Sequence, residues 1–145
     1  MCGIFGFWLN RKLNPDDIKK GDKLTELLAH RGPDNQQNWY DLEKGIYFGF
    51  RRLSIIDLSE NSNQPLIRGE TSLVFNGEIY NFKDIKKNLI IKNYKFKSSG
   101  DAEVLINVWK DQKKDCLKQI DGMYAFAIFN ENKLCLVTDH FGEKP

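Results

Sequence analysis

The sequence predicts one domain over residues 1–145, of α+β class, with its strands paired mostly antiparallel. Three observations support this fold class. Short apolar runs bounded by turn residues recur along the chain, and two segments carry apolar residues at helical spacing. Near the end, MYAFAIFN and KLCLVTD are separated by only a short turn, which is typical of a hairpin. No repeat or linker divides the chain.

The first forty residues are expected to form a strand, a helix and a turn. Residues 2–9, CGIFGFWL, are continuously apolar, which predicts a strand buried on both faces. A helix is expected over 14–30, because Asn14 is suited to cap it and a proline follows at its first position. Gly21 weakens that helix. The HRGPD stretch then indicates a turn.

The remaining elements follow from the same signals of apolar spacing and turn residues. A pair of strands is expected within 39–56, around a turn at 43–45, and further strands are expected at 71–76 and 94–98 and as the hairpin 123–139. Helices are expected at 79–89 and 101–112. A long polar loop is expected at 58–70.

Composition excludes several classes of protein. Lys and Arg number 22 against 20 Asp and Glu, and they are scattered, so no basic stripe suggests nucleic acid. No apolar stretch is long enough to span a membrane, and the opening lacks the pattern of a secretory signal. The three cysteines show no zinc or disulfide spacing, which favours a reducing compartment, the cytoplasm. Two histidines give little support to a metal site or a histidine triad.

Cys2 stands directly behind Met1, at the start of the first apolar run. Removal of Met1 would place a thiol and a free α-amino group on one residue. An α-amine has an ordinary pKa of roughly 8, so it can accept the proton of the thiol and pass it on. This pairing suits an N-terminal nucleophile. A small buried apolar residue is the alternative interpretation.

Asn76 and Gly77, in VFNGEIYN, allow two interpretations. Asn-Gly between apolar runs is the strongest short signal for a hairpin turn. The side-chain amide of Asn76 and the backbone N–H of Gly77 can also converge on one developing oxyanion. The two interpretations are compatible.

Charged residues near these positions could bind the two ends of an amino acid. Arg51 and Arg52 are adjacent, so only one of them faces a given side of a strand, where its guanidinium can grip a carboxylate with two hydrogen bonds. Asp101 precedes a helix and is suited either to cap it or to bind an α-ammonium group, with Glu78 as a second acid. A solvated arginine and an ordinary cap are the alternatives.

Taken together, the motifs resemble the glutaminase domain of glutamine-hydrolysing asparagine synthetases, which are class II glutamine amidotransferases within the N-terminal-nucleophile hydrolases. Related amidotransferase families share the opening Cys-Gly-Ile but lack the RGPD, RLSIID and NGEIYN forms. The motifs that carry the resemblance run in order along the whole chain: MCGIFGF, HRGPD, RRLSIIDLS, NQPL, VFNGEIYN, SSGDAEV, DGMYAFAIF and DHFGEKP.

The resemblance implies an αββα sandwich, incomplete at its C-terminus, that hydrolyses L-glutamine to glutamate and ammonia through a cysteine thioester. It also implies a role for each matching residue. Cys2 is the nucleophile and its α-amine the proton acceptor; Asn76 and Gly77 form the oxyanion hole; Arg52 binds the α-carboxylate and Asp101 the α-ammonium; Glu78 and the backbone around Leu53 and Ile55 complete the pocket.

The same resemblance implies partners outside this sequence. The glutaminase reaction needs no cofactor and no metal. ATP and Mg are expected only for a synthetase domain, on the same full-length chain or on a partner, that makes asparagine from aspartate with the ammonia. The Gly-rich phosphate loop of such a domain does not occur in these residues. A full-length protein of this kind is expected to form a homodimer.

Two alternatives remain open at this point. The chain could be an inactive glutamine-binding fragment, or it could supply ammonia to a different amidation. The sequence stops just after a strand, at Pro145, so we expect a truncated domain with unpaired edges and poor stability or aggregation. A monomeric preparation that melts cooperatively would contradict that expectation.

Overall fold

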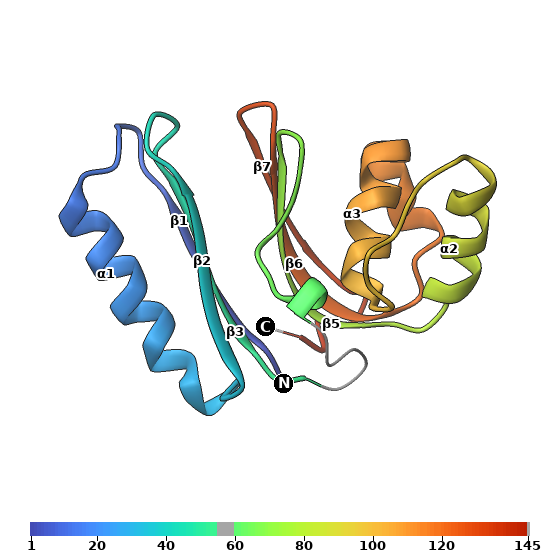
Figure 1. Cartoon of the computed structure of the whole chain (residues 1–145), viewed down its shortest axis with the longest axis horizontal. Helices are drawn as coiled ribbons and strands as arrows, with labels where there is room; N and C mark the ends of the chain where they lie inside the picture. The colour runs from blue at the N-terminus through green and yellow to red at the C-terminus, as the bar shows by residue number, and fades with distance from the viewer. Residues whose placement is uncertain (55–59, 145) are drawn as a thin grey trace.

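The computed structural model describes residues 1–54 and 60–144, which form four layers (Figure 1). A three-stranded and a four-stranded sheet, both antiparallel, pack face to face. One helix covers the outer face of the first sheet and two helices cover the second. This arrangement confirms the α+β class, the antiparallel pairing and the αββα layering. The first sheet has the order β1-β3-β2 and the second the order β4-β5-β6-β7.

The bounds of the elements are as follows. The strands are β1 (Gly3–Trp8), β2 (Asn35–Asp41), β3 (Ile46–Arg52), β4 (Leu66–Arg68), β5 (Thr71–Ile79), β6 (Gly122–Asn130) and β7 (Lys133–Thr138); the helices are α1 (Pro15–Glu26), α2 (Phe82–Ile91) and α3 (Asp101–Gln112), with short 3₁₀ helices at Leu27–His30, Glu60–Ser62 and Lys113–Lys118.

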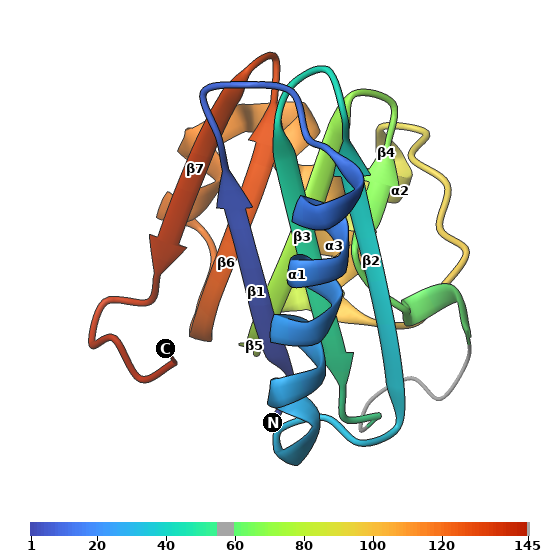
Figure 2. The ribbon, with the colours of Figure 1, turned by 90° about the vertical axis from the view of Figure 1, so that its left-hand side faces the viewer.

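The start of α1 follows the sequence prediction. The side chain of Asn14 accepts a hydrogen bond from the N–H of Asp17 at 2.9 Å, and the Asp17 carboxylate accepts one from the N–H of Asn14 at 2.9 Å. This reciprocal cap satisfies two amides that the helix itself cannot pair. Gly21 was expected only to weaken the helix. A Cβ there would lie 2.6 Å from the ring of Tyr47, so the glycine lets α1 lie directly on β3 (Figure 2).

Two hydrophobic cores hold the layers together. The smaller one lies between the sheets, and the larger one lies between the second sheet and its helices. The first comprises Ile46, Phe48, Phe50, Val74, Ala127 and Phe129. The second includes Phe75, Leu105 and Phe126, and α3 contributes an unbroken buried run, residues 101–109. Complete burial of one Val, Leu, Ile or Phe side chain stabilises a fold by about 1.5–3 kcal/mol relative to leaving that side chain exposed.

Three predictions about strands were wrong. Residues 94–98 form no strand, because the backbone N–H groups of Lys97 and Ser98 bond to the carboxylate of Glu103 instead of to a neighbouring strand. The expected polar loop at 58–70 contains β4, whose Leu66 is buried in the larger core. β1 is not buried on both faces: it is the end strand of its sheet, and Trp8 is 44% exposed.

The Asn76-Gly77 pair is not a hairpin turn. β5 continues through both residues to Ile79, and β6 pairs with it along this whole stretch, with Ala125 opposite Asn76. Pairing with β6 therefore overrides the local turn signal. The hairpin predicted at residues 123–139 is confirmed as β6 and β7, and its turn uses positive φ at Glu131 (52°) and Asn132 (57°). Within the described residues, no helix has the length and apolar character needed to cross a membrane.

Candidate active site

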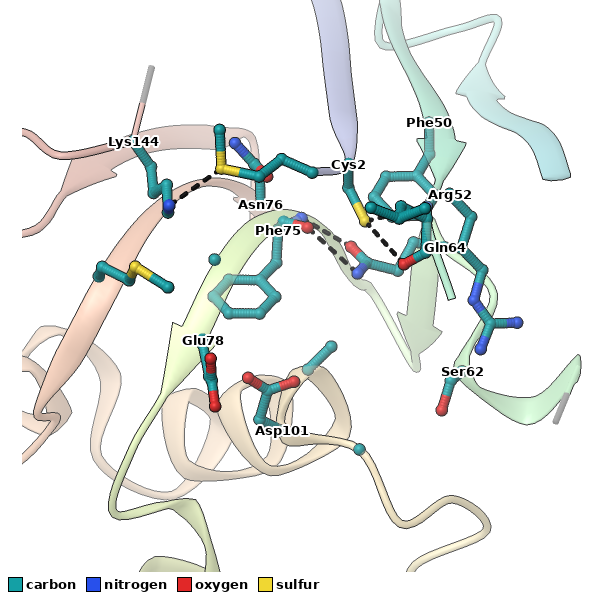
Figure 3. Close-up of a pocket in the computed structure, with 16 residues that line it drawn as sticks. Cys2, Phe50, Arg52, Ser62, Gln64, Phe75, Asn76, Glu78, Asp101 and Lys144 are labelled. Atoms are coloured by element: carbon teal, nitrogen blue, oxygen red, sulfur yellow. Dashed lines mark hydrogen bonds between the residues drawn. The ribbon is translucent and has the colours of Figure 1, made fainter. Parts of the chain in front are cut away.

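A cavity of about 140 Å³ opens at the end of the sandwich where β1 begins and β3 ends (Figure 3). Strand β5 and the first turn of α3 form its other walls. The cavity brings together residues that are far apart in the sequence. Its lining consists of Met1, Cys2, Phe50, Arg52, Leu53, Ser62, Gln64, Phe75, Asn76, Gly77, Glu78, Gly100, Asp101, Ala102, Met123 and Lys144.

Cys2 is half-buried and lines this cavity, one residue before β1. The antiparallel register of β1 and β3 pairs Gly3 with Arg51, which places Cys2 beside the end of β3. The sulfur lies 3.4 Å from the backbone nitrogen of Leu53, which donates to it, and 3.6 Å from the carbonyl oxygen of Leu53. The Cys2 carbonyl accepts a hydrogen bond from Nε of Arg31 at 3.2 Å. An N–H directed at the sulfur stabilises negative charge there.

Asn76 and Gly77 reach the cavity from the middle of β5. Side chains alternate along a strand, and Val74 packs between the sheets whereas Phe75 packs under the helices. Asn76 therefore shares the face of Val74, toward the sheet that carries Cys2, and it is 2% exposed. At Gly77, a Cβ would overlap the backbone carbonyl oxygen of Met123. The glycine is thus required by the close approach of β6.

A buried cation lines the same cavity. Arg52, at the end of β3, is 7% exposed. Its Nη1 donates a hydrogen bond to Oδ1 of Asn63 at 2.6 Å. Arg51, its neighbour, turns to the other side of the strand, where Nε bonds the carbonyl oxygen of Gly32 at 2.8 Å. The structure therefore separates the two arginines as strand geometry predicts, with Arg52 at the cavity.

A buried acid faces the cavity from α3. Asp101 is the first residue of that helix and is 7% exposed; its carboxylate accepts the N–H of Ile79 at 2.9 Å. Burial raises the pKa of Asp101 above its ordinary value, and the nearby carboxylate of Glu78 raises it further, against the hydrogen bond from Ile79. A cation beside Asp101 would relieve this cost of burying the charge.

The structure gathers the sequence-predicted site residues with one exception. Cys2, Arg52, Leu53, Asn76, Gly77, Glu78 and Asp101 all line the cavity, whereas Ile55 lies outside the described residues. Sequence reasoning assigned no role to Gln64, which is 5% exposed and hydrogen-bonded to β5. The NQPL motif contains Gln64 and could have indicated its importance, but the motif lies within residues 58–70, which were predicted to form a polar loop. Lys144, also unassigned, approaches Met1, with Nζ 2.9 Å from Sδ.

The cavity thus combines four kinds of chemical group. A thiol and a buried amide line it together with a cation and an acid, whose opposite charges could bind a zwitterionic amino acid. Across residues 1–54 and 60–144, no group of three or more His, Cys, Asp or Glu side chains gathers in a way that would hold a metal ion.

Comparison with known proteins shows which family the sequence matches. The sequence profile described as "Glutamine amidotransferase domain" matches residues 1–145. Asparagine synthetase [glutamine-hydrolyzing] 1 of Bacillus subtilis is 38% identical over 100% of this chain and 23% of its own length. Asparagine synthetase [glutamine-hydrolyzing] 3 of the same organism is 34% identical over 100% and 24%. Amidase chry2 of Gibberella zeae is 32% identical over 99% and 23%.

Among solved structures, glutamine phosphoribosylpyrophosphate amidotransferase of Bacillus subtilis, complexed with ADP and GMP, superposes with a TM-score of 0.74. It is 22% identical and covers 100% of this chain and 38% of its own, so the likeness concerns the fold. It confirms the layered fold expected from the resemblance. The chain spans about a quarter of the length of the curated relatives described above.

Proposed function

Because this chain belongs to the glutamine amidotransferase domain family, we propose that it hydrolyses the side-chain amide of L-glutamine through a thioester on Cys2. The observation that carries the proposal is that one cavity brings Cys2 together with a buried Asn76 and two buried groups of opposite charge, Arg52 and Asp101. An amide substrate that is itself a free amino acid matches all of these groups.

Binding uses the two oppositely charged groups of the cavity. The guanidinium of Arg52 holds the α-carboxylate of glutamine, and the carboxylate of Asp101 holds the α-ammonium, with Glu78 as a second acid nearby. These contacts place the side-chain amide of the substrate toward Cys2. Holding the reacting groups in this way removes much of the entropic part of the barrier.

The chemical step begins once Met1 has been removed. The freed α-amine of Cys2 takes the proton of the thiol, and the sulfur attacks the amide carbon. Negative charge develops on the amide oxygen, where the side-chain amide of Asn76 and the N–H of Gly77 donate to it. The C–N bond then breaks, and the departing nitrogen takes the proton from the α-amine and leaves as ammonia. Water hydrolyses the thioester to glutamate and returns the thiol.

The use of the ammonia is the second part of the proposal. Two relatives are named as glutamine-hydrolysing asparagine synthetases, which favours transfer to an ATP-dependent synthetase domain that makes asparagine, in cis or in trans. One relative carries a different name, amidase chry2, and this favours amidation of another acceptor as the second candidate. The cytoplasm is the compartment that suits this chemistry and the free thiols.

The experiment is to measure glutamate release from glutamine by the purified chain. Cys2→Ala should abolish it, and Asn76→Ala should lower kcat by about 10²- to 10³-fold. Cys135→Ala is the matched control, since Cys135 lies on β7 and does not line the cavity. Release that persists in Cys2→Ala would refute the proposal. Mass spectrometry with a glutamine-analogue electrophile should find the label on Cys2 of chains that lack Met1, and an unlabelled Cys2 would indicate an inactive binding fragment.

A further inference from the structure

Gln64 continues the β4–β5 ladder with its side chain. The last backbone pair of that ladder is Leu66 with Leu73, and extending the antiparallel register by two residues places position 64 opposite Phe75. A regular antiparallel pair at this position would give Phe75 two hydrogen bonds to the backbone of residue 64, one from its N–H and one to its carbonyl oxygen. The amide of Gln64 supplies both bonds instead: Oε1 accepts the N–H of Phe75 at 2.6 Å, and Nε2 donates to the carbonyl oxygen of Phe75 at 3.2 Å (Figure 3).

These two bonds act on the peptide unit next to Asn76. The carbonyl of Phe75 belongs to the planar peptide that joins Phe75 to Asn76, so a donor on that oxygen fixes the orientation of the plane. On the opposite edge, β6 pairs with the same stretch of β5. Asn76 is therefore held from both sides. With Gln64 only 5% exposed, water does not readily replace its bonds.

We propose that Gln64 is a positioning residue that holds the oxyanion donor Asn76 in place, an inference that rests on the proposed glutaminase function. Neighbouring Asn63 accepts a hydrogen bond from Arg52 at 2.6 Å. Two adjacent residues thus support two parts of the proposed site: Gln64 supports the strand that carries the proposed oxyanion donor, and Asn63 accepts a hydrogen bond from the cation proposed to bind the carboxylate of the substrate.

A positioning role and a merely structural role predict different kinetics. Asn76 is proposed to act on the charge of the transition state, so its displacement should lower kcat and leave KM nearly unchanged. Misplacing a catalytic group by about 1 Å costs on the order of 100-fold. We therefore expect Gln64→Ala to lower kcat by roughly 10- to 100-fold. A general loss of folded protein would instead lower the number of active sites, which labelling of Cys2 counts.

The decisive measurement is a double-mutant cycle. In an Asn76→Ala background the donor is already absent, so adding Gln64→Ala should change kcat by less than about twofold. The matched control is Asn81→Ala. Asn81 also bridges two backbone groups, donating to the carbonyl oxygen of Gln119 at 2.7 Å and accepting the N–H of Asp121 at 3.1 Å, but it does not line the cavity. It should cost similar stability and leave kcat per labelled site unchanged.

Amide hydrogen exchange tests the anchoring without any substrate. The N–H of Phe75 should be protected in the wild type and should exchange faster in Gln64→Ala, while the other paired amides of β5 keep their protection. Unchanged exchange at Phe75, a raised KM at constant kcat, additive losses in the double mutant, or an equal kcat loss in Asn81→Ala would each overturn the positioning role. An inactive wild type with faster exchange at Phe75 in Gln64→Ala would instead refute the proposed function, and with it any effect of Gln64 on catalysis, but not the anchoring of β5 by Gln64.

Discussion

Replacing Asp101 by asparagine should weaken glutamine binding without destabilising the fold. The carboxylate is buried at the first turn of α3, and burial, helped by Glu78, raises its pKa. Asparagine has nearly the same shape and keeps an oxygen that can accept the N–H of Ile79, which bonds Asp101 at 2.9 Å. The substitution therefore removes the charge and little else.

The size of the binding loss follows from the contact that disappears. A hydrogen bond to a charged partner contributes about 1.5–3 kcal/mol, and about 1.4 kcal/mol is a factor of ten in affinity. The KM for glutamine should therefore rise about 10- to 150-fold in Asp101→Asn. In the proposed binding mode the ammonium contact is made both in the bound substrate and in the transition state, so kcat should change much less.

The effect on stability has the opposite sign. An acid whose pKa is raised by folding binds its proton more tightly in the folded than in the unfolded state. Ionising Asp101 therefore lowers stability as pH rises from the ordinary value of 3.8 through the raised pKa, and the loss persists above it. Asparagine does not titrate. At pH 7, Asp101→Asn should melt at least as high as the wild type.

Two assays check this pair of expectations. Glutamate release is measured against glutamine concentration at constant pH, and thermal melts are recorded between pH 4 and pH 8. Asp121→Asn is the control, because it makes the same change in net charge at an exposed residue away from the cavity. An unchanged KM in Asp101→Asn would refute its binding role, and a clear fall in melting temperature at pH 7 would refute the electrostatic reasoning.

Three further predictions concern the rest of the fold. Arg68 lies 2.6 Å from the carboxylate of Glu103, which is 1% exposed, so Arg68→Ala leaves a buried charge without its cation. The free energy of unfolding, measured in urea, should fall by about 3 kcal/mol. This is the lower end of the range for buried pairs, because Arg68 is itself 28% exposed. Gly21→Ala should lower the melting temperature despite a gain of about 1 kcal/mol in helix propensity, since its Cβ would lie 2.6 Å from the Tyr47 ring. Burial raises the pKa of the Cys116 thiol to about 12, so iodoacetamide should label it only after unfolding, as read by mass spectrometry.

Each of these has a matched comparison. Lys87→Ala removes the partner of Asp84 in an exposed pair and should cost no more than about 0.5 kcal/mol, so an equal loss in Arg68→Ala would contradict the first expectation. Lys20→Ala, on the exposed side of α1, should leave the melting temperature unchanged. A higher melting temperature in Gly21→Ala would mean that the helix does not rest on Tyr47. Labelling of Cys116 in the folded protein would contradict its burial.

Much of the fold could be predicted because local patterns and tertiary environment agree. The cap of α1 depends on Asn14, Pro15 and Asp17, which are close in sequence, and their bonds form as expected. The hairpin of β6 and β7 likewise needs only a short turn between two apolar runs. The motifs that identified the family named eight site residues. Seven of them line one cavity of the structure, and the eighth, Ile55, lies outside the described residues.

Predictions failed where a distant group takes over a backbone bond. Lys97 and Ser98 have strand-like neighbours, but their N–H groups bond to Glu103, a buried carboxylate that no local pattern reveals. Gln64 was passed over for the same reason. Its side-chain amide bonds to the backbone of Phe75 in place of a residue of a neighbouring strand. Only the register of the sheet shows that no backbone pair fills the position opposite Phe75 on this edge.

The sequence by itself determined the fold class, the family and the chemical types of the groups at the site, because these depend on residue identity and on spacing along the chain. Only the tertiary structure decided that Asn76-Gly77 lies within a strand and that the side chain of Gln64 holds β5. Each of these depends on which strand lies alongside and in what register, and pairing between distant segments outweighs the weak preferences of a few neighbouring residues.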